Sequence, residues 1–178
     1  MLAKYIVPAM LLLATAAPAF AVEDLQIFRD VQRQVLRYTH FTIFDSISAD
    51  VDEGVVTLTG RVTMPYKKTD IERRVREVSG IREVHNRIEV LPASQSDDRL
   101  RYNIARAIYG HPAFEPYARM VNPPIHVIVE RGRVTLEGVV NSEVERALAR
   151  SIAGSFLSFD IKNELRTEEE ARAEIEKL

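Results

Sequence analysis

The sequence has no cysteine, so disulfides, thiol nucleophiles, zinc–thiolate sites, iron–sulfur clusters and a lipid anchor on cysteine are all excluded. It also has no excess of charge of one sign. The 24 basic and 26 acidic residues leave a formal net charge of −2. Overall charge therefore does not point to nucleic acid or to an anionic surface, and any basic recognition must be local.

Motifs of catalysis and metal binding are missing as well. The sequence contains no Gly-x-Ser-x-Gly elbow, no Gly-rich phosphate loop and no His-Glu-x-x-His helix. The four histidines, His40, His85, His111 and His126, are not at metal-ligand spacing. We therefore predict no catalytic residue, no metal site and no cofactor, and we expect a protein that is not an enzyme.

The first 21 residues have the pattern of a Sec-type signal peptide. Lys4 precedes a nearly unbroken apolar run from Tyr5 to Ala17, and Ala19-Phe20-Ala21 places small residues at the two cleavage positions. The alternative is a membrane anchor, but the run is at the short end of spanning length and contains prolines. We expect cleavage after Ala21, a periplasmic location and no transmembrane segment in the mature chain.

The rest of the chain contains an internal repeat. Residues 54–62 read GVVTLTGRV and residues 132–140 read GRVTLEGVV, identical at six of nine positions at an offset of 78. Further downstream, Val84-His85-Asn86-Arg87-Ile88 matches Ile161-Lys162-Asn163-Glu164-Leu165 at an offset of 77. Such repetition indicates two copies of one folding unit.

Each copy has the same order of elements. An amphipathic helix comes first, with apolar stripes of Phe28, Val31, Val35 and Leu36 in copy one and of Leu100, Ile104, Ala107 and Ile108 in copy two. A hairpin, a second helix and a third strand follow. The predicted fold is α+β, with two tandem αββαβ modules. Each would be a three-stranded mixed sheet covered on one face by two helices, with the third strand parallel to the second.

Seven residues of the repeat are predicted to be structural. Gly54 and Gly132 suit the hairpin turns, and Gly60 and Gly138 would leave room for a helix to pack on the sheet. Asn86 and Asn163 would pin the local backbone, because a buried amide must find partners. Gly80, in the turn before the third strand, completes the set, and its equivalent in copy two falls near Leu157.

These residues resemble the BON domain, named for the bacterial osmotically inducible protein Y and nodulation proteins. The resemblance rests on the stretch Tyr38 to Asp45, the GVVTLTGRV hairpin, the helix that follows, and the strand Ser79 to Ile88. It implies a periplasmic or envelope-attached protein associated with phospholipid surfaces, envelope stress and osmotic stress. The predicted boundaries are 22–92 for the first domain, 93–97 for a linker, 98–167 for the second domain and 168–178 for an acidic tail.

One helix face is a candidate binding surface. In copy two, Arg99, Tyr102, Arg106 and Tyr109 lie within about 80° of arc on the side away from the core stripe. Tyrosine suits a membrane interface, and arginine pairs well with phosphate. Phe114 and Tyr117, in a Pro-rich insertion before the next strand, would extend the surface. The same face could instead pack on the other module.

Two functions stay open. The first is a periplasmic binding protein that associates with anionic phospholipid surfaces in envelope maintenance or osmotic stress. The alternative is a protein-binding or chaperone-like module that contacts envelope proteins. A ridge of Arg29, Arg33 and Arg37 on the first helix is more typical of a solvated face.

Overall fold

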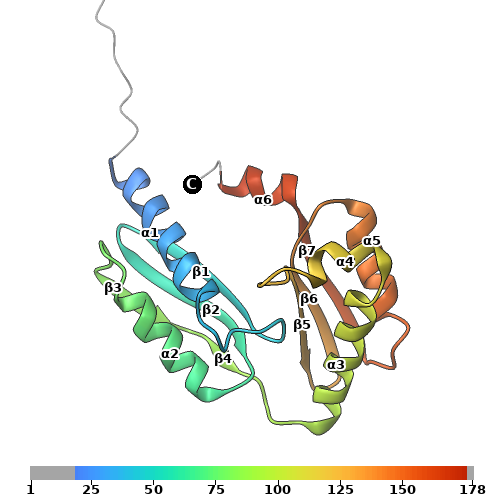
Figure 1. Cartoon of the computed structure of the whole chain (residues 1–178). Coiled ribbons are helices and arrows are strands. Elements are labelled where there is room, and N and C mark those ends of the chain that lie inside the picture. The colour runs from blue at the N-terminus through green and yellow to red at the C-terminus, as the bar shows by residue number, and fades with distance from the viewer. Residues whose placement is uncertain (1–18, 176–178) are drawn as a thin grey trace, which may run out of the picture.

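The computed structural model describes residues 19–175, and Figure 1 shows two helix-covered sheets joined by a short connection. Residues 1–18 of the predicted signal peptide lie outside the described residues. The first helix, α1, begins at Ala19 and so runs across the predicted cleavage point.

The first module has the predicted order of elements. It consists of α1 (Ala19–Leu36), β1 (Ser46–Asp52), β2 (Val55–Val62), α2 (Pro65–Arg76), β3 (Glu83–Asn86) and β4 (Glu89–Val90). β1 pairs with β2 antiparallel, and both β3 and β4 pair with β2 in parallel. The predicted third strand is thus split in two. The split shifts the alternation of buried and exposed side chains, so Leu91 is buried and Val90 is exposed.

The second module repeats this plan with one insertion. It consists of α3 (Gln95–Tyr109), η1 (Pro112–Phe114), α4 (Glu115–Ala118), β5 (Ile125–Glu130), β6 (Arg133–Val140), α5 (Glu143–Ala153), β7 (Asp160–Thr167) and α6 (Glu168–Ile175). β5 and β6 are antiparallel, and β7 is parallel to β6. The predicted fold of two tandem αββαβ modules with mixed sheets is therefore confirmed.

Each module has its own core between its helices and its sheet. Val31, Val56, Leu58 and Val75 are fully buried in the first core, and Ile104, Ile108, Val127 and Leu136 in the second. Burying one such side chain stabilises a module by about 1.5–3 kcal/mol. The predicted stripe of α1 was wrong at its edges: Ile27 is buried, Phe28 is only half-buried and Leu36 is exposed.

The connection between the modules is shorter than predicted. The Ser94 hydroxyl accepts a hydrogen bond from the amide of Asp97 at 3.2 Å, which caps α3 and lets it begin at Gln95. Three residues of the predicted linker 93–97 are therefore helical. The acidic tail begins with the capping box of Thr167 and Glu170, whose side chains each accept from the other's amide.

Both hairpin turns are tied to the first helix of their own module. Asp97 on α3 accepts from the amides of Arg131 and Gly132 at 2.8 and 2.9 Å. Asp24 on α1 accepts in the same way from Glu53 and Gly54, both at 2.9 Å. All four turn residues have positive φ, between 47° and 78°, so the two amides of each turn point at one carboxylate.

Gly60 and Gly138 are needed for a different reason from the one predicted. Both have positive φ, 113° and 121°. A Cβ on Gly60 would lie 2.1 Å from the carbonyl oxygen of Ser46, and one on Gly138 would lie 1.8 Å from that of Pro124. The close neighbour is thus the adjacent chain of the same sheet, not a helix, and the expectation of room for helix packing was wrong.

The two asparagines bond local backbone, although their side chains are half-buried and not fully buried as expected. Asn86 donates to the carbonyl of Lys68 on α2 at 3.1 Å and accepts from the amide of Ile88. Asn163 donates to the carbonyl of Arg146 on α5 at 3.0 Å and accepts from Leu165. Each amide therefore bonds its strand to the helix that precedes it.

The modules meet through the segment 41–46, which ends at the first residue of β1. The Ile43 carbonyl accepts from the Val127 amide at 2.8 Å, and the side chains of Ile43 and Phe44 pack against the core of the second module. Glu137 on β6 pairs with Arg61 on β2 at 2.8 Å and bonds Ser46. Since Arg61 and Glu137 alternate with core residues, the pair joins the two sheet faces that carry no helix.

Candidate functional site

The predicted surface on α3 is only partly present. Arg99, Tyr102 and Arg106 are exposed, with Tyr102 at 64%. The Tyr102 ring meets that of Phe44 from the first module edge-on, with centroids 4.8 Å apart. This face therefore borders the contact between modules while its arginines remain open to solvent. We call Arg99, Tyr102 and Arg106 the α3 edge.

Tyr109 turns inward from the α3 edge. Its hydroxyl donates to the carbonyl of Ile125 at 2.6 Å and accepts from the amide of the same residue at 3.0 Å. Burial raises the pKa of the Tyr109 phenol. Tyr109 thus satisfies both backbone hydrogen-bonding groups of Ile125, the first residue of β5, and its half-buried ring adds little to an exposed surface.

Phe114 and Tyr117 are core residues, which corrects the prediction that they extend a surface. Phe114 is fully buried, and Tyr117 is 4% exposed. The Tyr117 hydroxyl donates to Glu145 at 2.6 Å and accepts from the amide of Asn141 at 2.9 Å. Burial and the bond to Glu145 raise the pKa of Tyr117 to about 12. The insertion folds as η1 and α4, which turn both rings toward the sheet.

An exposed apolar loop was missed by the sequence analysis. Residues 156–159 are the last four of the connection from α5 to β7, and among them Leu157 is 98% exposed and Phe159 is 84% exposed. The signal was present: three of the four residues in Phe156-Leu157-Ser158-Phe159 are large and apolar where the first module has Ser79-Gly80-Ile81-Arg82. We call this segment the 156–159 loop.

The arginine ridge of α1 differs from the α3 edge. Arg29, Arg33 and Arg37 are exposed, as predicted for a solvated face. Arg33 forms an ion pair with Asp30 at 2.7 Å, and the residues that share this face with the arginines, Asp30 and Gln34, are polar. The ridge therefore serves as an internal comparison for tests of the α3 edge.

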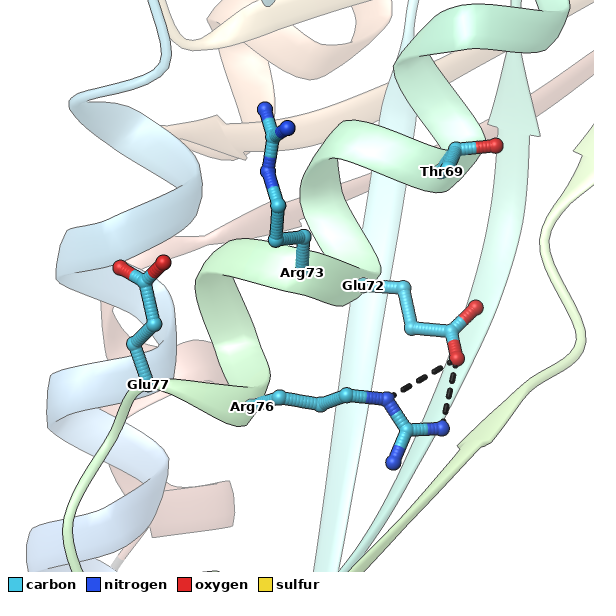
Figure 2. A pocket seen from close by; sticks show the side chains of 5 residues that line it. All are labelled: Thr69, Glu72, Arg73, Arg76 and Glu77. Carbon is cyan, nitrogen blue, oxygen red and sulfur yellow. Dashed lines mark hydrogen bonds and ion pairs between the residues drawn. The ribbon is translucent and has the colours of Figure 1, made fainter.

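A shallow hollow on α2 shows no arrangement for chemistry. Its lining consists of Thr69, Glu72, Arg73, Arg76 and Glu77. Figure 2 shows Glu72 and Arg76 turned toward each other, and their closest approach is 2.6 Å. Hydrogen bonds from Asn86 and Arg76 lower the pKa of Glu72, so this carboxylate is engaged as an acceptor.

One buried charged pair supports the contact between modules. Lys67 and Asp45 lie 2.6 Å apart, with side chains 5% and 0% exposed. Burial alone would raise the pKa of Asp45, but hydrogen bonds from Lys67, Thr63 and Thr42 outweigh it and lower that pKa below its ordinary value. The pair fixes the end of the segment 41–46, so its role is structural.

Within residues 19–175, no cluster of three or more histidine, aspartate or glutamate side chains is arranged to hold a metal ion. Among the helices of this same range, none combines the length and the hydropathy needed to cross a bilayer.

Comparison with known proteins identifies the repeat. The family model of the BON domain matches residues 23–92 and again residues 96–169. No curated protein matches the chain. Among solved structures, CdsD, a structural protein of the type III secretion system of Chlamydia trachomatis, is 13% identical with a TM-score of 0.28 and covers 85% of this chain and 97% of its own. Its C-terminal domain is 10% identical with a TM-score of 0.26, covering 84% and 98%.

Proposed function

The chain belongs to the BON domain family as a tandem protein, and from this premise we infer that it is an exported, non-enzymatic envelope protein that associates with anionic phospholipid surfaces. The observation that carries the lipid part is the α3 edge. It presents two exposed arginines on either side of an exposed tyrosine ring, while α1 of the first module presents arginines without such a ring.

The contribution of each exposed arginine determines how strongly the protein is expected to bind anionic vesicles. An arginine near an anionic bilayer contributes about 1 kcal/mol. Two such residues give weak attraction, which the net negative charge of the chain opposes. We therefore expect binding to anionic vesicles that is weak and sensitive to salt, and little binding to zwitterionic vesicles. A role in envelope maintenance or osmotic stress follows from the same association.

Vesicle sedimentation tests this function. The protein is expected to sediment with phosphatidylglycerol–phosphatidylcholine vesicles at low salt and to be released as salt is raised. Arg99→Glu with Arg106→Glu should reduce binding by roughly tenfold or more, because two attractive charges become repulsive. Tyr102 is left unchanged, since its contact with Phe44 would confuse a binding defect with a loss of the module contact.

The matched control is Arg29→Glu with Arg33→Glu on α1, which makes the same change in net charge. It should weaken binding much less. Equal effects of the two pairs would mean that only net charge matters. A protein that does not sediment with anionic vesicles even at low salt would contradict the function and favour a protein partner in the envelope.

Export is tested separately. N-terminal sequencing of the protein from the envelope fraction is expected to begin at Val22, after the Ala19-Phe20-Ala21 site. A protein that begins at Met1 in that fraction would contradict cleavage.

A further inference from the structure

The 156–159 loop exposes more apolar surface than the fold of its module requires. Leu157 and Phe159 are 98% and 84% exposed, and they lie two residues apart in the connection between α5 and β7. Single exposed apolar residues are ordinary, but two large ones on one short loop form a patch that water solvates poorly.

The first module shows that the backbone does not need these side chains. The amide of Phe159 donates to the carbonyl of Gly132 at 2.9 Å, and the amide of Arg82 donates to that of Gly54 at 2.8 Å. Phe159 and Arg82 are therefore equivalent, and the same offset of 77 pairs Leu157 with Gly80. The connection thus has the same length in both modules and carries glycine and arginine in the first, and leucine and phenylalanine in the second, although the positive φ of Gly80 is not repeated at Leu157.

The neighbours of the loop suit an anionic, amphipathic surface. The Phe159 ring lies over the hairpin turn, 2.7 Å from where a Cβ on Gly132 would be, and Arg131 and Arg133 flank that glycine with exposed side chains. Asp97 links the same turn to the start of α3, two residues before the exposed Arg99. Arg131 and Arg133 thus adjoin the turn against which the loop packs, and Arg99 follows the residue that holds this turn.

Most carboxylates at this end are already engaged. Asp97 accepts from the turn amides, Asp98 pairs with Arg101 at 3.4 Å, and Glu130 lies 3.8 Å from Arg131. Asp160 is exposed and lies opposite Arg133 in the backbone register, so it is the carboxylate of this end that stays most open. The acidic helix α6 follows the far end of β7, eight residues away, so its glutamates do not oppose an approach of this end to an anionic surface.

We propose that the 156–159 loop inserts Leu157 and Phe159 into the interfacial region of a phospholipid bilayer, while Arg131 and Arg133 contact lipid phosphates. The proposal rests on the proposed function and adds to it the apolar element that two arginines of the α3 edge lack. A bilayer is favoured over a protein groove because the apolar side chains are exposed on a loop that packs on a turn with two exposed arginines.

Paired serine substitutions test the insertion. Leu157→Ser with Phe159→Ser leaves the charge unchanged and is expected to weaken binding to anionic vesicles about tenfold. The matched control is Met120→Ser with Val121→Ser, two exposed apolar residues (47% and 97%) in the loop before β5, at the opposite end of the module. The control should change binding less than about twofold, since that loop would face away from the bilayer.

A fluorescence measurement reports insertion directly. The chain has no tryptophan, so Phe159→Trp introduces a single tryptophan, which can be excited apart from the six tyrosines. Its emission should shift to the blue on anionic vesicles and should be quenched by lipids brominated on their acyl chains. Tyr66→Trp, at a half-exposed position on α2 of the first module, should show neither change.

The outcomes separate the two proposals. If the unaltered protein binds vesicles and the serine variant of the loop binds equally well, or if the emission of the Phe159→Trp variant is not quenched, insertion is wrong and the proposed function stands. If the unaltered protein does not bind, both fail. If the serine variant alters self-association in sedimentation and leaves vesicle binding unchanged, the loop packs against a second copy of the chain and insertion is overturned.

Discussion

Gly60 and Gly138 show how a single missing side chain sets the approach of neighbouring strands. Each lies in the second strand of its hairpin with a positive φ, and each faces a backbone carbonyl within about 2 Å of where a Cβ would be. Backbone cannot move aside as the end of a flexible side chain can. Any residue other than glycine would therefore combine a strained φ with a clash inside the sheet.

Gly60→Ala and Gly138→Ala are each expected to lower the free energy of unfolding by about 3 kcal/mol or more, from backbone strain and overpacking together. Urea denaturation followed by circular dichroism measures the loss. Gly154→Ala is the control, since Gly154 has a φ of −66° and its nearest atom would lie 3.3 Å from the new Cβ. It should change stability by less than about 1 kcal/mol. Three equal effects would contradict the argument.

The glycines also show what a sequence pattern can and cannot predict at this scale. Their place in the repeat predicted that a side chain is excluded, and that is correct. The pattern could not tell which neighbour excludes the side chain. Either a carbonyl of the adjacent chain or a packed helix would require glycine at that position. Asn86 and Asn163 were easier, because an amide that is shielded from water beside its own helix must bond nearby groups, here helix carbonyls and, for Asn86, also Glu72.

At the scale of elements, the first helix of each module holds its hairpin through one carboxylate. Asp24 and Asp97 are 73 residues apart, and the same spacing relates Val31 to Ile104 and Val35 to Ile108 in the two cores. The aspartates are therefore part of the repeat. They were missed because this helix lies at a different offset from the hairpin, which the insertion of η1 and α4 lengthens in the second module.

Asp97→Ala should lower the free energy of unfolding by about 2–3 kcal/mol, because it leaves the amides of Arg131 and Gly132 without their acceptor. Asp24→Ala should cost less, about 1 kcal/mol, since Asp24 is only half-buried and water can replace the carboxylate. Urea denaturation of both variants checks the order. A larger loss for Asp24 would mean that burial does not control the strength of these bonds.

At the scale of the whole molecule, titratable groups lie where the modules meet. The His126 ring, on β5, is 5.4 Å from the ring of Phe41 in the first module. Burial lowers the pKa of His126 below its ordinary 6.5, and the nearby carboxylate of Glu137 offsets this only in part. The pKa of Asp45 is also lowered, here by its hydrogen bonds to Lys67, Thr63 and Thr42, which outweigh burial.

Acid is therefore expected to destabilise the module contact in two steps. A lowered pKa in the folded state means that the unfolded chain binds the proton more tightly. The stabilisation is then complete above the ordinary pKa and is lost as pH falls. For His126 the loss begins below 6.5, and for Asp45 below 3.8.

Thermal unfolding of the intact protein at about pH 7.5 and about pH 5 tests the first step. The midpoint should be lower at the acidic pH, and His126→Gln should remove most of that difference. His85→Gln, at an exposed position on β3, is the control and should leave the difference in place. A pH dependence that survives His126→Gln would place its origin elsewhere.

The sequence by itself determined the architecture, because strand alternation, helical periodicity and turn glycines are local and occur twice. It could not determine which aromatic residues are surface and which are core. The sequence alone suggested an exposed aromatic patch that includes Tyr109, Phe114 and Tyr117. In the structure, η1 and α4 direct the rings of Phe114 and Tyr117 into the core, and Tyr109 bonds the start of β5. The exposure of Leu157 and Phe159 and the contact of Tyr102 with Phe44 were likewise decided by tertiary structure, because burial depends on which distant segments come to lie beside a side chain.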